Sequence, residues 1–220
     1  SCLFPSPCSK LPDSHDRMLS LMRQFLKWRK TQPKKIHFFV ASGIRHDLAI
    51  KSPEYISLLA KYFVGGHLKV APEHICPAVL DMMQKPHNDL FETFEKHFAA
   101  ATKKAHKQQY LVPYFISSHP GSSPEEATRL TEYLVRRQWR PRQVQDFVPV
   151  PLALATAMFV SGLSPKRKPI HIPRGRSEKR LQMALLQYYD KRNYKTINAY
   201  LSVRNKHKLL AKIRNLQLTR

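Results

Sequence analysis

The stretch YLVPYFISSHPGSS, residues 110–123, joins an apolar run to a polar turn. Its first eight residues are rich in β-branched and aromatic side chains, which is typical of a buried strand. The turn contains His119, Pro120 and Gly121, and SPEE at 123–126 then forms a capping box with proline at the first helical position. The stretch therefore predicts a strand, a tight turn and a helix.

Three other apolar runs share this layout. They are KIHFFVAS at 35–42, HLKVA at 67–71 and QVQDFVPV at 143–150, and each is followed by a polar or proline-containing cluster and a helical pattern. Their spacing suits strand–helix–strand crossovers, which connect parallel strands. Since α/β barrels and open α/β sheets bind ligands at the carboxyl ends of parallel strands, we expect ligand-facing groups there. Four parallel strands cannot close a barrel, so the pattern predicts part of a larger sheet.

Helices are expected between and after these strands, from apolar periodicity and capping residues. The predicted helical ranges are 14–30, 53–62, 78–107 with an interruption near 85–86, 123–138, 177–189, and one or two helices after 193. Within 78–107, Phe91, Phe94, Glu95 and Phe98 are expected to mark a buried stripe. The fold class is therefore α/β.

The net charge of +23 is concentrated near the end of the chain, where residues 161–220 hold 16 Lys and Arg against only Glu178 and Asp190. We expect two parts, an α/β domain over 1–160 and a basic connector with a helical tail over 161–220. No apolar run of about 18 residues and no signal-peptide pattern occurs, which argues against a membrane protein and favours a cytoplasmic location. The three cysteines are too few for a disulfide scaffold.

The basic tail admits two interpretations. Its Lys and Arg side chains could neutralise phosphates of a nucleic acid, with tyrosines available for stacking on bases. More often, such charge runs are solvated helix faces. The tail residues concerned are Lys166, Arg167, Lys168, Arg180, Arg204, Lys206, Lys208, Lys212 and Arg214, with Tyr188, Tyr189, Tyr194 and Tyr200.

Five motifs together resemble the YgiQ-type family of radical S-adenosylmethionine (radical SAM) proteins. They are ASGIRHDLA (41–49), GGHLKVAPEH (65–74), MMQKP (82–86), QYLVPYFISSHPG (109–121) and VQDFVPVPLALATAMF (144–159). The resemblance covers roughly residues 1–197, and the tail beyond it departs from the family pattern.

This resemblance implies an incomplete, partial (β/α) barrel that holds SAM and a [4Fe–4S] cluster at its open end. Such a cluster is bound by a C-x3-C-x2-C loop, which leaves one iron free for SAM. The motif is absent here, because Cys2 and Cys8 have five residues between them and Cys76 is remote. The resemblance therefore implies the carboxyl-terminal portion of the family, which needs a missing N-terminal barrel half and holds no cluster on its own.

The resemblance also implies cofactor-binding positions. Ile116, Ser118, Pro120 and Gly121 take the places of the fifth-strand pattern beside the adenosine, with Ser118 where many members have glycine. The absence of a side chain at Gly121 would let the backbone approach the adenine.

Two charged residues at strand ends are further candidates. Glu73 could accept hydrogen bonds from the ribose hydroxyls, and Arg45 could pair with the SAM carboxylate as a two-pronged donor. A structural ion pair of Arg45 with Asp47 or with Glu73 is the alternative. His74, His119 and Tyr114 are candidates to face a substrate, and His74 beside Cys76 is at most a weak metal site, because no second pair lies at ligand spacing.

The leading hypothesis is a fragment of a radical SAM enzyme of unidentified substrate, inactive alone. The alternative is a basic nucleic-acid-binding module without catalysis, and a third reading is the product of an interrupted gene.

Overall fold

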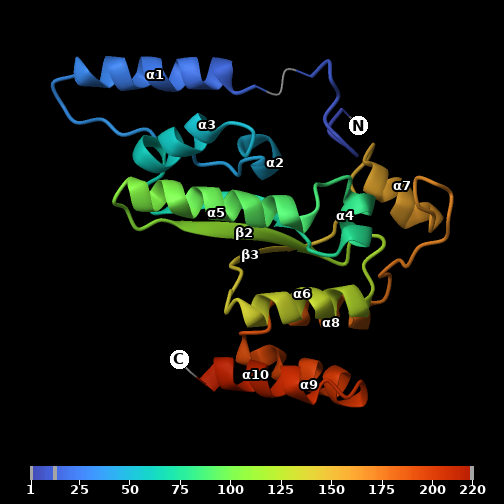
Figure 1. Ribbon diagram of the computed structural model, residues 1–220. Helices are drawn as coiled ribbons and strands as arrows, with labels where there is room; N and C mark the ends of the chain where they lie inside the picture. Colours follow the sequence, from blue (N-terminus) through green and yellow to red (C-terminus); the bar gives the residue numbers. More distant parts are fainter. Residues whose placement is uncertain (1, 12–13, 219–220) are drawn as a thin grey trace. The chain divides into compact units, whose positions relative to one another are not determined.

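A computed structural model of the chain describes residues 2–11 and 14–218 (Figure 1). The chain divides into two compact units. The first comprises the residues up to Pro72 together with Pro86–Pro113, and the second comprises Glu73–Lys85 and everything from Tyr114 on. These units are interleaved in sequence. The sequence-based division at residue 160 stays a prediction about domain organisation.

The first unit is mainly helical. Its elements are α1 (Asp16–Lys30), α2 (His46–Ala49), α3 (Pro53–Leu58), the π-helical turn η1 (Leu59–Phe63), α5 (Asn88–Lys104) and most of strand β1 (His67–Glu73). The predicted aromatic stripe on α5 is buried, with Phe91, Phe94 and Phe98 all facing the interior. Helix α5 packs against α2 and α3 along this stripe. The spacing of the three rings, one per helical turn, explains this arrangement.

The predicted first strand is wrong. Residues 35–42 form no strand in the described part of the chain. The backbone amide of Val40 donates to the Phe63 carbonyl, and the nearest pairing is an isolated parallel bridge between Ile44 and Val70. Apolar side chains suit a strand, but a strand also needs a continuous ladder with a neighbour, and these two contacts do not make one.

The second unit contains the end of β2 (Tyr110–Ser117), the short strand β3 (Gln143–Asp146) and seven further elements. These are α4 (Pro77–Met83), α6 (Pro124–Arg136), α7 (Leu154–Ser161), α8 (Arg176–Leu186), the 3₁₀ turn η2 (Lys191–Asn193), α9 (Tyr194–Val203) and α10 (His207–Leu218). The capping box predicted at the start of α6 is present.

The three strands form one sheet in the order β1-β2-β3, with β2 and β3 parallel. Ile116 lies opposite Gln145, and Ser117 lies opposite Asp146. The mixed α/β class is thus confirmed, while closure into a partial barrel stays a prediction. Strand β3 ends four residues before the predicted end at 150, because the prolines at 149 and 151 cannot donate to a ladder.

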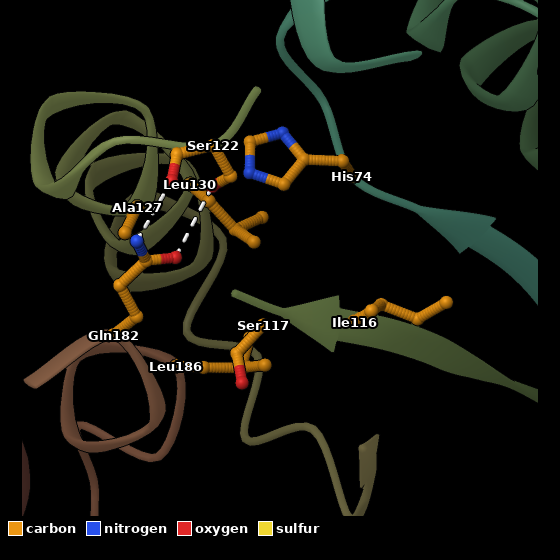
Figure 2. Close-up of a pocket in the computed structure, with 8 residues that line it drawn as sticks. All are labelled: His74, Ile116, Ser117, Ser122, Ala127, Leu130, Gln182 and Leu186. Atoms are coloured by element: carbon orange, nitrogen blue, oxygen red, sulfur yellow. Dashed lines mark hydrogen bonds between the residues drawn. The ribbon is translucent and has the colours of Figure 1, made fainter. Parts of the chain in front are cut away.

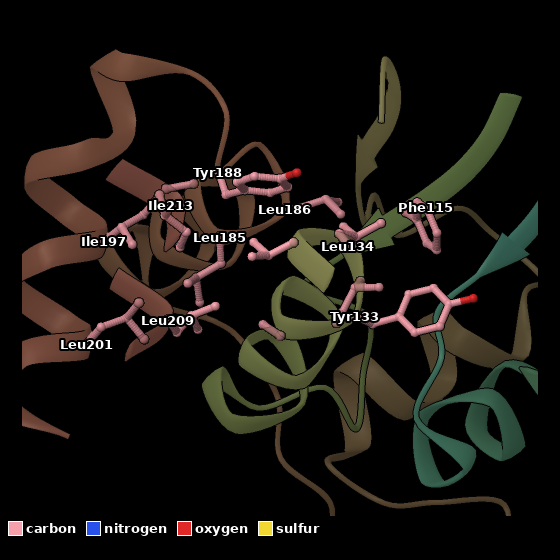
Figure 3. Packing of buried hydrophobic residues seen from close by; sticks show 14 residues of the cluster. Phe115, Tyr133, Leu134, Leu185, Leu186, Tyr188, Ile197, Leu201, Leu209 and Ile213 are labelled. Carbon is pink, nitrogen blue, oxygen red and sulfur yellow. The ribbon is translucent and has the colours of Figure 1, made fainter. Parts of the chain in front are cut away.

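The core of the second unit lies between α6 and the last three helices (Figure 3). Helix α8 packs against both α6 and α9, and α9 packs against α10. The fully buried residues of this core, at 0% exposure, are Phe115, Leu134, Leu185, Tyr188, Ile197, Leu201 and Ile213. The basic helices α9 and α10 therefore contribute an apolar face to this core. No helix in the described ranges is long and apolar enough to cross a membrane.

Candidate functional site

Polar side chains gather where the strands of the second unit end. The Ser117 hydroxyl, at the end of β2, donates to Asp146 Oδ1 over 2.8 Å at the end of β3. The amide of Phe147 donates to the Ser117 carbonyl. These two bonds tie the ends of the neighbouring strands together, as the sequence predicts for parallel strands.

The two faces of β2 differ. Phe115 points into the core with α6 and α8, so Tyr114 and Ile116 point to the opposite face, where both are half-buried. On that face, the Tyr114 hydroxyl donates to Gln145 Oε1 over 2.5 Å. Burial raises the pKa of Tyr114, and the nearby Glu73 carboxylate adds to the rise.

Glu73 is held at the last position of β1 in a left-handed conformation, with φ of 63°. Its carboxylate pairs with the Lys85 ammonium over 2.8 Å, and its side chain is 13% exposed. Two pairs thus lie near the ends of the strands: Glu73, the last residue of β1, with Lys85 from the segment after α4, and Gln145 of β3 with Tyr114 of β2. We call these four residues the strand-end cluster. They offer acceptors and donors on the sheet face away from α6 and α8.

The turn after β2, residues 118–122, has an unusual backbone. Ser118 has φ of 59° and Gly121 has φ of 90°. Ser118 and Pro120 are buried, whereas Gly121 and Ile116 are half-buried. Of the four predicted adenosine-side residues, the structure therefore leaves only Ile116 and Gly121 partly open to solvent.

Gly121 lies against helix α4. A Cβ atom added there would come within 2.8 Å of Met82 Cγ. The Gly121 amide donates to the His171 carbonyl over 2.8 Å. Local packing and the positive φ thus give a sufficient reason for glycine, and its predicted role beside an adenine stays a prediction.

Replacing Gly121 with alanine is expected to destabilise the second unit by about 2 kcal/mol, from the left-handed backbone and the contact with Met82 together. Gly162→Ala is the matched control, since Gly162 also has positive φ but nothing lies within 4 Å of its added Cβ. That variant should lose only about 1 kcal/mol. Urea unfolding followed by circular dichroism measures both, and equal losses would contradict the contact with Met82.

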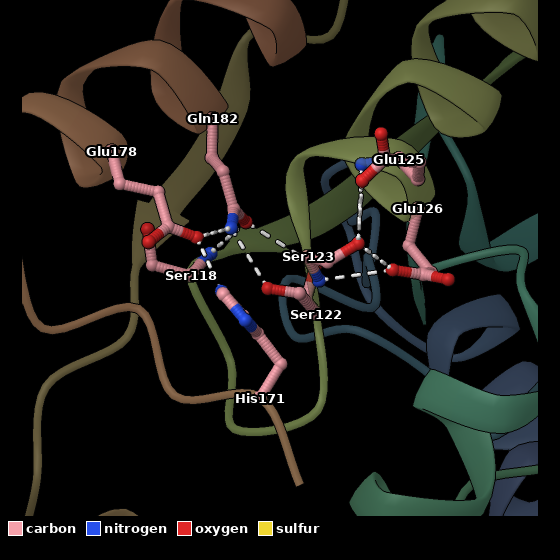
Figure 4. A network of polar contacts seen from close by, with 8 residues as sticks. All are labelled: Ser118, Ser122, Ser123, Glu125, Glu126, His171, Glu178 and Gln182. Atoms are coloured by element: carbon pink, nitrogen blue, oxygen red, sulfur yellow. Dashed lines mark hydrogen bonds and ion pairs between the residues drawn. The ribbon is translucent and has the colours of Figure 1, made fainter.

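A buried amide holds this turn from the other side (Figure 4). Gln182 of α8 is 1% exposed. Its Oε1 accepts from the Ser118 amide over 3.0 Å and from the Ser122 hydroxyl over 3.2 Å. Its Nε2 donates to the Ser122 carbonyl over 2.8 Å and to Glu178 Oε1 over 3.2 Å. The same Glu178 oxygen lies 2.6 Å from His171 Nε2.

A small cavity adjoins this network (Figure 2). Its volume is about 10 Å³, and His74, Ser117, Ser122 and Gln182 contribute to its polar lining. A space of this size holds roughly one water molecule and cannot hold a nucleoside.

Two buried histidines lie near the turn. Burial lowers the pKa of His74 to about 3 and that of His119 to about 4. His74 Nδ1 accepts the amide of Cys76 over 3.0 Å, and His119 Nδ1 lies 2.8 Å from the Pro120 carbonyl. Both rings are therefore neutral, structural hydrogen-bonding groups at neutral pH.

The weak metal site suggested by His74 and Cys76 gains no further ligands. The Cys76 thiol points to the Glu126 carbonyl, and burial raises the pKa of the thiol to about 11. Within residues 2–11 and 14–218, no group of three His, Cys, Asp or Glu side chains is placed to hold a metal ion.

Arg45 lies in the first unit and the other five predicted cofactor residues lie in the second. Its guanidinium donates to both carboxylate oxygens of Asp47, over 2.9 and 2.5 Å. Burial alone would raise the pKa of Asp47, but these bonds and the Arg45 charge outweigh it and lower the pKa. The ion pair with Asp47 that the sequence offered as an alternative is therefore present.

Two cations of the basic tail contact helix α6. Lys206 pairs with Glu132 over 3.0 Å, and Arg204 pairs with Glu125 over 3.6 Å. Arg204 also lies over the Tyr200 ring, 3.8 Å from its centre. Exposed pairs of this kind contribute little to stability. Nucleic-acid binding by the tail stays a prediction.

Three residues of the site were not singled out from the sequence. Gln145 had a detectable signal, because QVQD alternates polar and apolar residues and so places its glutamines on one face. Lys85 had a weaker signal: it is the cation of the MMQKP motif, which follows the strand that ends at Glu73. Gln182 had none, because it is 60 or more residues from its partners in the turn.

Comparison with known proteins places these features in context. Residues 142–213 match a family described as "Domain of unknown function (DUF3362)", a range that includes β3, α7, α8 and α9. The chain is 42% identical over 217 residues to the UPF0313 protein RPA0679 of Rhodopseudomonas palustris, covering 96% of this chain and 32% of that protein.

Other relatives give the same picture. The UPF0313 protein VP1980 of Vibrio parahaemolyticus is 40% identical over 215 residues, with 94% of this chain and 27% of that protein covered. The UPF0313 protein YgiQ of Escherichia coli is 37% identical over 221 residues, with 98% and 29% covered. The chain spans about a third of the length of the curated relatives it matches. Similarity along nearly the whole chain confirms the predicted resemblance to the YgiQ-type UPF0313 proteins. The expectation that the tail after residue 197 departs from them is wrong, because the family match alone extends to residue 213.

Proposed function

We propose that this chain forms the later strands of a radical SAM-type enzyme and receives SAM against the carboxyl ends of β1 and β2. The observation that carries the proposal is the strand-end cluster, which collects a carboxylate, an ammonium, a phenol and an amide at one end of the sheet. Ligands of α/β proteins bind at such strand ends. The resemblance of the five sequence motifs supplies the identity of the ligand.

The residues of this chain do not fit a [4Fe–4S] cluster. Cys2 and Cys8 are exposed and Cys76 is buried, and a cluster needs thiolates gathered on one loop. We therefore assign no cluster and no electron-transfer step to this chain. In the proposal, the cluster belongs to polypeptide that the longer relatives have beyond the matched portion.

The residues do fit part of the nucleoside of SAM. Glu73 can accept hydrogen bonds from ribose hydroxyls, and Lys85 holds its carboxylate in place. Ile116, on the same face as Tyr114, offers an apolar surface to a purine ring. Ser118 and Pro120 are buried, so in this proposal they shape the turn and make no contact with the ligand.

A chimera tests the proposal directly. The 220-residue chain would replace the matched 217 residues of the RPA0679 protein, and the product would be reconstituted anaerobically with iron and sulfide. After reduction, we expect the chimera to release 5′-deoxyadenosine from SAM, and the chain alone to release none. A chimera that binds about four irons but forms no 5′-deoxyadenosine would overturn the proposal. So would reductive SAM cleavage by the chain alone.

Glu73→Gln in the chimera should raise the KM for SAM about tenfold, because a charge-assisted hydrogen bond is lost. Glu132→Gln is the matched control, since Glu132 is a partly exposed carboxylate on α6 that lies outside the strand-end cluster. Its KM should equal that of the unmodified chimera. Equal KM values for Glu73→Gln and the control would remove Glu73 from the proposed SAM site.

A further inference from the structure

The turn at residues 118–122 is held in a strained shape from outside its own segment. Ser118 is not glycine, yet it adopts φ of 59°, a left-handed conformation that side chains disfavour. Such conformations persist where the surrounding structure fixes them. The contacts that fix this one come largely from residues 171–182.

Each end of the turn is also fixed. Before it, Ser117 is bonded to Asp146 of β3. After it, the Ser123 capping box starts helix α6, with the Glu126 carboxylate accepting the Ser123 amide over 3.0 Å. Between these ends, the turn amides of Ser118 and Gly121 donate to Gln182 Oε1 and to the His171 carbonyl respectively.

Gln182 is suited to this role because its amide has no freedom to rearrange. Its oxygen accepts two hydrogen bonds and its nitrogen donates two, at 1% exposure. Burying an amide is costly unless its polar atoms are bonded, so the turn and the amide stabilise one another's positions. Glu178, one helical turn before Gln182, is fixed in turn by His171.

We propose that Gln182 is a positioning residue for the turn that follows β2, next to the proposed SAM site, and that holding this turn is a role of the region matched to DUF3362. Gln182 and His171 both lie within that matched range of 142–213. The contacts above support the role of Gln182 in fixing the turn, and its effect on SAM binding rests on the proposed function. The role is conformational, since Gln182 touches the turn and not the strand-end cluster.

Hydrogen exchange on the 220-residue chain tests the contacts without any ligand. Gln182→Met keeps the length of the side chain and removes all four bonds, and we expect the Ser118 amide to exchange about tenfold faster. Gln217→Met is the matched control, because Gln217 is also a buried amide, on α10, whose nitrogen donates to the Tyr188 carbonyl over 2.6 Å. It should leave the Ser118 amide unchanged.

If Gln182→Met fails to fold, Ser122→Ala provides the test. It removes only the bond from the Ser122 hydroxyl to Gln182, and the Ser118 amide should then exchange about threefold faster. Unchanged exchange of Ser118 in a folded Gln182→Met or Ser122→Ala variant would overturn the proposal. Equal acceleration by Gln217→Met would do the same, because it would mean a general loosening of the unit.

The chimera with the RPA0679 protein then tests the link to SAM. Gln182→Met should raise the KM for SAM about tenfold with kcat changed less than twofold, while Gln217→Met should leave KM unchanged. A fall in kcat alone, or parallel effects of both variants, would contradict a positioning role. If the chimera cleaves no SAM at all, the proposed function fails, while the exchange result still decides whether Gln182 fixes the turn.

Discussion

Leu134→Ala is expected to destabilise the second unit by about 4 kcal/mol. Leu134 lies on α6 at 0% exposure, in the cluster that joins α6 to α8, α9 and α10. Truncation removes the transfer free energy of the side chain and leaves a cavity that the rigid helices on either side cannot fill. Because α6 begins at the turn that Gln182 holds, the loss should extend to the turn as well.

Urea unfolding at neutral pH, followed by circular dichroism, gives the loss as a shift in the midpoint at constant slope. Leu152→Ala is the control, since it is the same substitution at a fully exposed leucine between β3 and α7. It should change the free energy of unfolding by less than about 0.5 kcal/mol. Similar losses for both variants would contradict the core described here.

Lowering the pH from 7 towards 4 should destabilise the second unit, because two of its histidines are buried. His74 and His119 have pKa values of about 3 and about 4, below the ordinary value of 6.5. Below pH 6.5 the unfolded chain binds protons at these residues and the folded chain does not. Their contribution to stability is therefore complete above pH 6.5 and is lost as the pH falls towards 4. At 1.36 kcal/mol per pKa unit, His74 alone contributes on the order of 5 kcal/mol.

The measurement is the urea midpoint at several pH values between 7.5 and about 4. His74→Gln should flatten the fall in stability, whereas His207→Gln, at an exposed position at the start of α10, should keep the slope of the parent chain. The difference between the two slopes isolates His74 from the carboxylates that titrate in the same range. A free energy of unfolding that stays constant from pH 7 to pH 5 would contradict the burial of both rings.

Local signals in the sequence located several elements well. The capping box at Ser123 and Glu126 marked the start of α6, and the proline at 53 lies at the first position of α3. The spacing of Phe91, Phe94 and Phe98 indicated the buried face of α5. These features depend on neighbours within a few residues, so the sequence alone was sufficient to place them.

Features that depend on distant partners were not predictable in this way. Residues 35–42 have the composition of a strand, but whether they form one depends on a neighbouring chain segment that composition does not specify. Gln182 resembles any polar residue on an amphipathic helix until the fold brings it to Ser118 and Ser122.

The interleaving of the two units has a consequence for genetic dissection. The backbone passes from the first unit to the second at Glu73, returns at Pro86 and crosses again at Tyr114, within strand β2. A stop codon at Glu73 or at Pro86 removes residues of both units, and one at Tyr114 leaves the first unit with only residues 73–85 of the second. Deletion series that suit proteins whose domains are consecutive in sequence will therefore yield incomplete units here. Point substitutions are the appropriate tool for assigning roles within this chain.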